Sequence, residues 1–595
     1  MARTRRLIVA ALACATVAAP ILATSVGSTA QAARPSAKSA PQNTLGVKVV
    51  RFKQGTSRTD MYAAVTTAGG EVLNDLSKIG RLAVRSDSKT FDSKLKANKN
   101  VASLWTDRMI KIDLVDAGTD AAANKPALGN PGATGPFDPW HDADGPFVDQ
   151  DAPGVWQWDD DANGARGARE AGVNGDGVVV AVIDTGVQGS HKELLPNYDN
   201  HNSANTIPCN LMTRQFGPGL GQRDCSSEDT EGHGTWVASR IGGAVNGFAS
   251  NGIAPDVTII GYKALSTTLG GGLTSWITDA MVRACDAGAD LINMSLGGYD
   301  APGVDDEDYM MWVDAVNYCR SKGTAIVASA GNEHVRIHKV DMTLGGVALT
   351  GVGQVDGGDE GILTIIPGDT VANNDLRGLL ETPAGVPGVI MVSSTSNVNG
   401  APVAGSLAHL ASTPEVGARD QLAYYSSYGE RIDIAAPGGA RKLGIPRYDA
   451  GPQDVLYGGY GELGALTQNG EICQDPALAS FLTFSCFKVQ GAAFGWLQGT
   501  SMSAPNTTGV AALTLAAHPG LDPDGLLAQL QATARTGMVN GTGPVDPADT
   551  GNDFFGNACA SGYCHLDYYP GGAGNPISFT DAYGAGIVNA AAAVG

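Results

Sequence analysis

The sequence predicts an α/β fold built on a mostly parallel central sheet with helices on both faces. Short, continuously apolar segments typical of buried strands alternate with segments whose apolar residues recur at helical spacing. Apolar strands that alternate with helices indicate a parallel sheet with a helix across each return connection. The chain has 595 residues, 80 of them glycine, which favours one large core with many loops over a helical bundle.

The first strand of the main body is predicted at residues 178–183, where every side chain is apolar and five of the six are β-branched. The run ends in Asp184, so this strand places a carboxylate at its C-terminal end. Similar runs predict three further strands, at residues 257–265, 289–294 and 324–329. Continuous apolar runs of this kind are typical of strands covered on both faces.

Two helices are predicted between these strands, because apolar residues recur three or four positions apart and form one stripe on each helix. The stripes are Ile277, Met281 and Cys285 in residues 274–287, and Trp312, Val316 and Cys319 in residues 309–321. We expect both helices to cover the sheet.

Four short motifs contain side chains suited to catalysis. D-T-G contains Asp184, E-G-H-G-T contains His233, and S-A-G-N-E, after a predicted strand, contains Asn332. The fourth, Q-G-T-S-M-S-A-P, places Ser501 before a long apolar segment, which predicts a serine at the start of a buried helix. The helix dipole favours negative charge at that end, so the position suits a nucleophile.

The order Asp, His, Ser, with a short motif around each residue, resembles the subtilisin-like serine peptidases. The resemblance covers most of the chain from about residue 178 onward. Asn332 stands where the family keeps its oxyanion-hole asparagine. The segment I-N-M-S-L-G resembles the strand that lines the family's substrate cleft, which implies that Ser295, Leu296 and Gly297 bind substrate.

The resemblance implies a defined chemistry. A serine hydroxyl is a weak nucleophile near neutral pH, so its proton must pass to a neutral imidazole during attack on a carbonyl. His233 is the expected base, and Asp184 is the carboxylate that orients it and stabilises its charged form. The Asn332 amide and the Ser501 backbone N–H are the expected donors to the oxyanion. We therefore expect a serine endopeptidase that forms an acyl-enzyme with protein or peptide substrates.

Two other functions are compatible with these motifs. Each of the four residues alone could be a helix cap, a turn residue or a structural histidine. A non-catalytic binding protein could keep the fold without turnover, although the intact motifs argue against it. An exported esterase could use the same triad, because acyl transfer does not by itself select amide over ester. The leader described below favours peptide substrates.

Two positions depart from the family pattern around the histidine. The family usually has histidine after G-H-G-T and glycine a little later, whereas this chain has Trp236 and Ser239. Neither is a catalytic group. We expect the packing behind His233 to differ from that of the family.

The N-terminal residues have the pattern of a secretory signal. Basic residues at positions 3, 5 and 6 precede an apolar run and a final A-Q-A, so residues 1–32 are predicted to be removed by cleavage after Ala32. Pro20 within the apolar run argues against a membrane anchor, and no later run is long enough to span a bilayer. We expect a secreted, extracellular protein with no membrane association once the signal is removed.

Three further segments are predicted after the signal. Residues 33–112 resemble the inhibitory propeptides of these peptidases and are expected to form a small α+β, ferredoxin-like domain, here called the leader. Its expected strands are residues 47–52, 82–84 and 109–112, and its expected helices are residues 60–68 and 90–97. Residues 113–153 are a predicted linker with the processing site, and residues 154–595 are the predicted catalytic domain, here called the body.

Charge is unevenly divided between leader and body. Residues 1–112 contain 18 basic and 6 acidic residues, whereas the rest of the chain contains 21 basic and 54 acidic residues. Opposite charges would help the leader dock on the body, with its end at residues 107–113 in the cleft as a bound product. The alternative is that acidity only keeps a secreted protein soluble.

Eight cysteines remain after removal of the signal, and eight cysteines allow 105 pairings. Sequential pairing is the simplest arrangement. The pairs would be Cys209–Cys225, Cys285–Cys319, Cys473–Cys486 and Cys559–Cys564. For Cys285 and Cys319, which lie on apolar helical stripes, two buried free thiols are the alternative. No C-x-x-C pair or Cys/His cluster is present, so these cysteines do not indicate a metal site.

No cofactor is expected to be required, and calcium is the one candidate structural ion. Residues 159–170 match the calcium-loop pattern D-x-[DN]-x-[DN]-G-x₅-E, although the segment before them is a poor helix. The alternative is a solvated, acidic helix start. The family often binds calcium soon after its catalytic aspartate, but Gln188 and Gly189 occupy that neighbourhood here.

Two stretches of the body are longer than the resemblance requires. Residues 333–386 are rich in Gly, Val and Asp, and residues 440–497 are rich in Gly and aromatic residues. We expect both to be surface insertions beside the cleft. The expected partners are substrates and the leader itself, with no nucleic acid, and the protein is expected to be a monomer.

Overall fold

The computed structural model describes residues 43–111, 157–358, 375–396, 421–423, 425–439, 461–468, 470, 486–537 and 577–595. All of them belong to one compact unit, Ala37–Gly595. The predicted signal peptide and linker, and the cysteines at 473, 559 and 564, lie outside the described residues. Among the helices that the structure describes, none is long and apolar enough to cross a membrane.

The leader contains an antiparallel sheet with the strand order β2-β3-β1-β4. Its elements are β1 (Lys48–Phe52), α1 (Arg58–Ala68), β2 (Glu71–Asn74), β3 (Arg81–Arg85), α2 (Phe91–Lys96) and β4 (Val101–Thr106). Both helices pack on one face of the sheet, where Val65 and Leu95 meet Val50 and Val84 in a small core. This β-α-β-β-α-β arrangement is that of the predicted ferredoxin-like domain.

The last predicted strand of the leader does not join this sheet. Residues Met109–Lys111 form β5, which pairs with β9 (Gly271–Leu273) of the body. The fourth strand of the leader sheet is instead β4, which was not predicted. Its half-exposed, mixed sequence V-A-S-L-W-T lacks the continuous apolar run that marks a buried strand.

The body is built around a sheet with the order β17-β16-β12-β10-β6-β8-β7, in which β18 also pairs with β16. Its strands are β6 (Val179–Asp184), β7 (Ala204–Asn205), β8 (Thr258–Lys263), β10 (Leu291–Met294), β12 (Ala325–Ser329), β16 (Val389–Ser396), β17 (Gln421–Leu422) and β18 (Ile434–Pro437). All pairs are parallel except β16 with β17. The predicted α/β class and mostly parallel sheet are confirmed.

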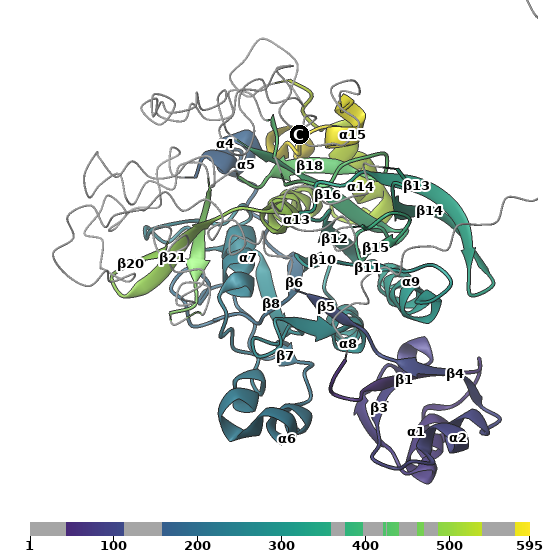
Figure 1. The fold of residues 1–595 in the computed structure, drawn as a ribbon. Coiled ribbons are helices and arrows are strands. Elements are labelled where there is room, and N and C mark those ends of the chain that lie inside the picture. The colour runs from purple at the N-terminus through teal and green to yellow at the C-terminus, as the bar shows by residue number, and fades with distance from the viewer. Residues whose placement is uncertain are drawn as a thin grey trace, which may run out of the picture. The chain divides into compact units, whose positions relative to one another are not determined.

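Helices cover both faces of this sheet, as predicted (Figure 1). In β6, Val180 and Val182 join the core beneath α7 and α13, whereas Ala181 and Ile183 join the core beneath α8 and α9. This division explains why the strand is apolar throughout. The helices are α7 (His233–Gly242), α8 (Thr274–Asp286), α9 (Asp306–Ser321) and α13 (Thr500–Ala517). The remaining helices of the body are α4 (Trp158–Ala162), α5 (Ala165–Glu170), α6 (Cys209–Leu220), α14 (Pro523–Ala532), α15 (Phe579–Tyr583) and α16 (Ala590–Ala593).

The two longer stretches form additional sheets. In the first, the hairpin β13 (Ile337–Leu344) and β14 (Val347–Val355) is joined through β15 (Leu380–Thr382) to β11 (Gly298–Asp300). In the second, β21 (Ala492–Leu497) lies between β19 (Glu462–Leu466) and β20 (Cys486–Val489). The expectation of a surface insertion is wrong for β19 and for β21, whose residues are buried. Both strands share a core with Phe248, so they are part of the packed body.

Two of the predicted disulfides are present in the structure. Cys209 and Cys225 are bonded, with a Cα–Cα distance of 4.6 Å. Cys285 of α8 and Cys319 of α9 are bonded as well, with a Cα–Cα distance of 5.3 Å, which excludes the alternative of two free thiols. The second bridge ties the two helices on one face of the sheet to each other.

A buried ionic cluster joins the start of the body to α7. Arg240 of α7 forms ion pairs with Asp159 and Asp160 of α4, and its Nη1 donates to the Asn251 carbonyl at 2.9 Å. Arg169 of α5 forms a second ion pair with Asp160. Because the guanidinium of Arg240 is completely buried, it is the charge that compensates the equally buried Asp159.

Replacing Arg240 with methionine leaves the Asp159 carboxylate buried without its countercharge. We expect the free energy of unfolding, measured by denaturant titration, to fall by about 3 to 5 kcal/mol. The matched control is Arg166→Ala, which removes a largely exposed ion pair with Asp161 and should change it by about 1 kcal/mol or less. An Arg240→Met loss no larger than the control would contradict this assignment.

Candidate active site

Asp184 and His233 form a pair at the centre of the site. Asp184 ends β6, His233 begins α7, and both side chains are completely buried. His233 Nδ1 lies 2.8 Å from Asp184 Oδ1. A carboxylate at this distance favours the tautomer in which Nδ1–H donates, so Nε2 is the basic nitrogen. Nε2 forms no hydrogen bond with any residue in the described part of the chain.

The charges around His233 make its imidazole more basic than usual. Burial favours the neutral ring and would lower its pKa, but the carboxylates of Asp184, Glu231 and Asp229 raise the pKa of His233 to about 9. Burial in turn raises the pKa of Glu231 to about 7. Glu231 Oε2 accepts the backbone N–H of His233 at 2.7 Å, so it lies beside the first turn of α7. These carboxylates favour the protonated form that the base reaches during catalysis.

Asp229 organises the loop that leads into α7. Its carboxylate accepts the backbone N–H groups of Glu231 and Gly232 at 2.9 Å. It also accepts the hydroxyls of Thr185 at 3.0 Å and Thr235 at 2.6 Å. Because Thr185 follows Asp184 directly, Asp229 joins the end of β6 to the start of α7. Asp229 therefore helps to fix the distance between Asp184 and His233.

Ser501 lies in the first turn of α13, the buried helix that its motif predicted, and α13 packs against α7. Its backbone carbonyl accepts the hydroxyl of Ser295 at 2.8 Å, and its own hydroxyl lies 3.5 Å from the Ser295 carbonyl. Ser295 follows β10, so this contact connects the sheet edge to the helix start. Ser295 therefore positions Ser501, in addition to its predicted contact with substrate.

The side-chain oxygen of Asn332 binds to the same helix start. Its Oδ1 accepts the backbone N–H of Thr500 at 2.8 Å and the Thr500 hydroxyl at 2.9 Å. Because Thr500 directly precedes Ser501, these two bonds hold the Asn332 carboxamide at the start of α13. Asn332 is only 5 % exposed, so a donor in this place acts in a largely water-free environment.

The two other predicted substrate-binding residues lie beside the leader. Leu296 is completely buried and belongs to the same apolar cluster as Ile110 of β5. Gly297 adjoins β11, and Glu381 of β15 lies next to it, since a Cβ on Gly297 would be 3.5 Å from Glu381 Oε1. The structure thus brings the segment from Ser295 to Gly297 to the same edge as Asn332 and Ser501.

The packing behind His233 involves the second longer stretch. Trp236 Nε1 donates to the Gly495 carbonyl of β21 at 3.0 Å, and the hydroxyl of Ser239 accepts the Ala465 N–H of β19 at 2.9 Å. A Cβ on Gly464 would lie 2.6 Å from Trp236 Nε1, so only glycine leaves room for the indole. The two departures from the family pattern therefore contact β19 and β21, which stabilise α7 from behind.

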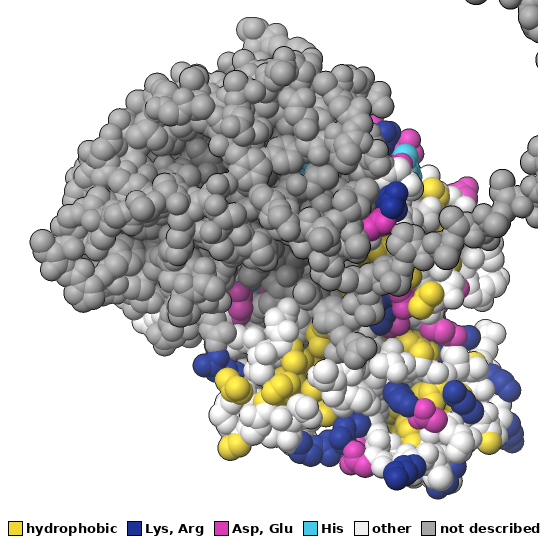
Figure 2. Space-filling view, in the orientation of Figure 1, with side chains coloured by type: hydrophobic (Ala, Val, Ile, Leu, Met, Phe, Trp, Pro, Cys, Tyr) yellow, Lys and Arg dark blue, Asp and Glu magenta, His cyan; other side chains and the backbone are white. Residues whose placement is uncertain are grey.

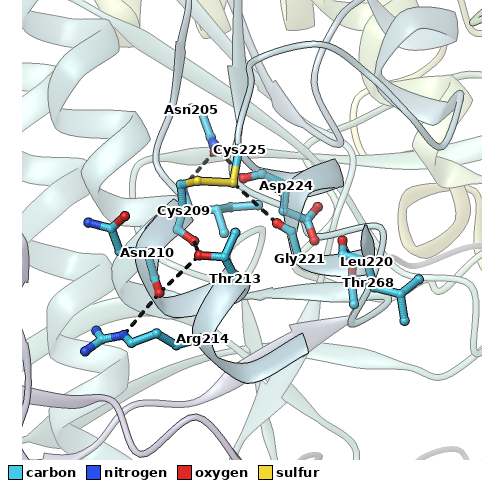
Figure 3. Close-up of a disulfide and its surroundings, with 11 residues drawn as sticks. Asn205, Cys209, Asn210, Thr213, Arg214, Leu220, Gly221, Asp224, Cys225 and Thr268 are labelled. Carbon is cyan, nitrogen blue, oxygen red and sulfur yellow. Dashed lines mark hydrogen bonds between the residues drawn. A yellow bond between two sulfur atoms is a disulfide. The ribbon is translucent and has the colours of Figure 1, made fainter. Parts of the chain in front are cut away.

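The Cys209–Cys225 disulfide, shown in Figure 3 with the neighbouring Asp224, is connected to the end of β6 by a chain of contacts. Asp224, next to Cys225, accepts the hydroxyl of Ser266 at 2.7 Å and lies 3.6 Å from the buried Lys263 ammonium. Lys263 donates to the Thr185 carbonyl at 2.8 Å. The disulfide thus restrains a loop whose carboxylate supports the backbone next to Asp184.

Residues 159–170, which match the calcium-loop pattern, are not gathered around a common point. Asp159 pairs with Arg240, and Asn163 donates to Asn506 at 2.7 Å. The segment forms α4 and α5, joined at Gly164. Within the described ranges, no group of three or more His, Cys, Asp or Glu side chains is placed to hold a metal ion.

Sequence reasoning missed the residues that support the catalytic groups. Asp229 and Lys263 belong to none of the four motifs, and Glu231 opens the E-G-H-G-T motif without having been predicted to contact His233. The only local signal is at Asp229, since an aspartate a few residues before a helix commonly accepts backbone N–H groups. The contacts of Lys263 are with residues far away in the sequence, so no local pattern predicts them.

The site combines a buried Asp–His pair with a serine at the start of a buried helix and an asparagine fixed at that start. These groups are carried by a mostly parallel sheet covered by helices. The combination is typical of a class of serine hydrolases. The chain belongs to the subtilase family. The family model matches residues 175–557, which is more than half of the chain.

Individual relatives agree with this assignment. The minor extracellular protease Vpr of Bacillus subtilis is 32% identical over 191 residues, which is 32% of this chain and 21% of that protein. Subtilisin NAT of Bacillus subtilis subsp. natto is 24% identical over 363 residues, which is 61% of this chain and 62% of that protein. The matches therefore span less than two thirds of these relatives.

A solved structure shows the same fold. The epidermin leader peptide processing serine protease EpiP from Staphylococcus aureus matches with a TM-score of 0.56 at 17% identity. The match covers 92% of this chain and 97% of that chain. At this identity the likeness supports the architecture.

The raised pKa of His233 predicts an alkaline shift of activity. Because the base must be neutral, kcat/KM should rise with pH, with an apparent pKa above the usual 6.5 and toward 9. Glu231→Gln keeps an acceptor for the His233 N–H but removes one negative charge. The acidic limb of the kcat/KM profile should then move to lower pH.

The control for this experiment is Glu228→Gln, which removes an exposed carboxylate from the same loop. It should leave the limb nearly in place. An unchanged limb in Glu231→Gln would show that the Glu231 carboxylate does not set the basicity of His233.

Proposed function

We propose that this protein is a secreted serine endopeptidase that hydrolyses extracellular proteins or peptides and is made as a self-processed zymogen. The observation that supports this most directly is the buried Asp184–His233 pair, 2.8 Å apart, at the start of a helix packed against the helix that presents Ser501. Membership of the subtilase family supports the same reaction class.

In the proposed mechanism, the Ser501 hydroxyl attacks the scissile carbonyl carbon while His233 Nε2 accepts its proton. The resulting imidazolium is stabilised by Asp184 through Nδ1. The carbonyl oxygen becomes an oxyanion that accepts hydrogen bonds from the Asn332 amide and the Ser501 backbone N–H. Nε2–H then donates its proton to the leaving amine, and the C–N bond breaks to give an acyl-enzyme.

The second half of the reaction uses the same groups with water as the nucleophile. His233 accepts a proton from water as it attacks the ester carbonyl, and the same donors stabilise the second oxyanion. Collapse of this intermediate returns the proton to Ser501 and releases the carboxylic acid. The carboxylates around His233 lower the barrier of both attacks, because each attack creates an imidazolium.

Contacts between the end of the leader and the body support the proposal that the leader inhibits the enzyme. Its strand β5 pairs antiparallel with β9, with Ile110 opposite Gly272, and occupies an edge where an extended substrate would pair. The preceding Asp107 accepts the Ser275 hydroxyl and lies 3.3 Å from its backbone N–H, at the start of α8. Arg108 forms ion pairs with Asp300 at 2.7 Å and with Asp305. The end of the leader therefore lies beside the proposed substrate cleft.

Charge complementarity at the contacts supports docking of the leader. Lys and Arg side chains are frequent on the visible surface of the leader (Figure 2). Arg51 forms two hydrogen bonds of 2.9 Å with Glu307 of α9, and Arg81 pairs with Asp314 of the same helix. These pairs match basic leader residues with acidic body residues, as the charge division along the chain predicts.

Export is proposed from the N-terminal signal pattern and from relatives. The minor extracellular protease named above is an exported member of the family by its name. The two disulfides of the described body agree with an oxidising compartment.

Ser501→Ala should abolish both proteolysis and self-processing, because one nucleophile is proposed to serve both reactions. The purified variant should remain a species that begins near Ala33, whereas wild-type protein should mature and digest casein. N-terminal sequencing and a casein assay with a serine-directed inhibitor control test this. Normal maturation of purified Ser501→Ala protein, with no other protease present, would refute self-processing.

The isolated leader should inhibit the mature enzyme competitively, and its association should slow as salt rises, since exposed charges are screened beyond about 8 Å at physiological ionic strength. Arg108→Ala should raise the inhibition constant at least about 30-fold, because Asp300 is left buried without its partner. Arg58→Ala is the control, since Arg58 pairs with Asp75 inside the leader. No inhibition by a folded leader at any salt would make the leader a passive spacer.

A further inference from the structure

We propose that the carboxylates of Glu333 and Glu381 form an acidic subsite that selects substrates with Lys or Arg as the residue supplying the scissile carbonyl. This inference rests on the proposed peptidase function and adds a substrate class to it. Glu333 follows Asn332 directly, and Glu381 belongs to β15 in the first of the two longer stretches.

Strand pairing brings these carboxylates together. β15 runs antiparallel to β11, with Glu381 directly opposite Tyr299. Residues opposite each other in an antiparallel pair have side chains on the same face of the sheet. The Tyr299 hydroxyl donates to Glu333 Oε2 at 2.7 Å. Tyr299 thus lies between the two acidic residues and contacts one of them directly.

Two glycines lie next to the carboxylates. A Cβ on Gly297 would lie 3.5 Å from Glu381 Oε1. A Cβ on Gly331 would lie 2.6 Å from Glu333 Oε2, 3.2 Å from the Tyr299 hydroxyl and 3.3 Å from Ser427 Oγ. Gly331 also has a φ of +98°, which a residue with a side chain rarely adopts. Glycine is therefore required at position 331, where the polar atoms converge, whereas a side chain on residue 297 would be in ordinary contact with Glu381.

One polar atom at this place has no partner among the described residues. Ser427 is completely buried, and its hydroxyl makes no hydrogen bond in the described part of the chain. A buried hydroxyl without a partner costs free energy, so its position next to Glu333 indicates a site that is completed by a polar ligand. An ammonium or guanidinium group is a donor and would serve both the hydroxyl and the carboxylates.

The subsite adjoins the reacting groups on two sides. Gly297 is two residues from Ser295, whose hydroxyl bonds to the Ser501 carbonyl, and Gly331 precedes Asn332. A substrate whose carbonyl carbon is held at Ser501 has the side chain of that same residue closest to these two segments. The recognised side chain is therefore that of the residue on the acyl side of the scissile bond.

Burial determines which side chain is preferred. Glu381 is 1 % exposed, and burial raises the pKa of Glu333 above its usual value. A cation in the subsite neutralises carboxylates that are otherwise costly to keep charged. A leucine would remove water from them without neutralising them, and a glutamate would add a repulsive charge.

Cleavage of matched peptides that differ only in this residue tests the proposal on the mature enzyme. We expect kcat/KM for Arg and Lys peptides to exceed that for the Leu peptide by about 10²-fold or more, with the Glu peptide lowest. Equal kcat/KM for the series, or a preference for Leu, would overturn the proposal. Loss of all hydrolysis, including that of casein, would instead overturn the proposed function.

Variants of Glu333 and Glu381 distinguish a role in substrate recognition from a purely structural role. Glu381→Gln and Glu333→Gln preserve an acceptor for the Gly385 N–H and for the Tyr299 hydroxyl, respectively. Each should reduce the preference for Arg over Leu at least about 10-fold, by lowering kcat/KM for the Arg peptide and, because one buried charge fewer is left unneutralised, raising kcat/KM for the Leu peptide. The control Glu430→Gln neutralises a largely exposed carboxylate that pairs with His338 and should not alter the preference. Equal losses on Arg and Leu peptides in both variants would show that the pair is only structural.

Discussion

The contact between Asp184 and His233 is the interaction on which the rest of the site depends. Both side chains are completely buried, they come from separate elements, and they must remain 2.8 Å apart for the imidazole to keep its orientation. Burial of a carboxylate without compensation is expensive, so the surroundings have to supply donors. Thr185 N–H donates to Asp184 at 2.7 Å, and Lys263 is held beneath the same turn by Thr185 and Asp224. The contacts of this turn extend to the Cys209–Cys225 disulfide.

The start of α7 fixes His233, the other member of the pair. Asp229 accepts the N–H of Thr235 and Glu231 accepts that of His233, two groups that the first turn of a helix leaves without an intrahelical partner. Both carboxylates also add negative charge beside the imidazole. Further along α7, Trp236 is enclosed by β19 and β21, and Arg240 is held by Asp159 and Asp160. One helix therefore connects His233 to the first helices of the body and to a sheet that the family resemblance did not require.

Much of this architecture could be predicted from the sequence, because the determinants are local. The apolar run before Asp184 and the stripes that contain Cys285 and Cys319 specify a strand and two helices within a few residues of their observed limits. The family and the α/β fold are confirmed, Asp184 ends the expected strand, and Ser501 lies at the start of the expected helix. Long-range pairing could not be predicted. Residues 109–112 look like one more leader strand, but their partner β9 lies about 160 residues further along the chain. The burial of β19 likewise depends on Trp236, which the composition of residues 440–497 does not indicate.

The central claim is that Ser501 is a nucleophile activated by His233, and covalent labelling tests it most directly. Mature enzyme would be treated with an organophosphonate that reacts with activated serines, and the adduct would be mapped by peptide mass spectrometry as a function of time. The account predicts a single adduct on Ser501, whose rate of formation falls by orders of magnitude in His233→Ala protein. An adduct on another residue, or labelling of Ser501 at the same rate without the imidazole, would contradict it.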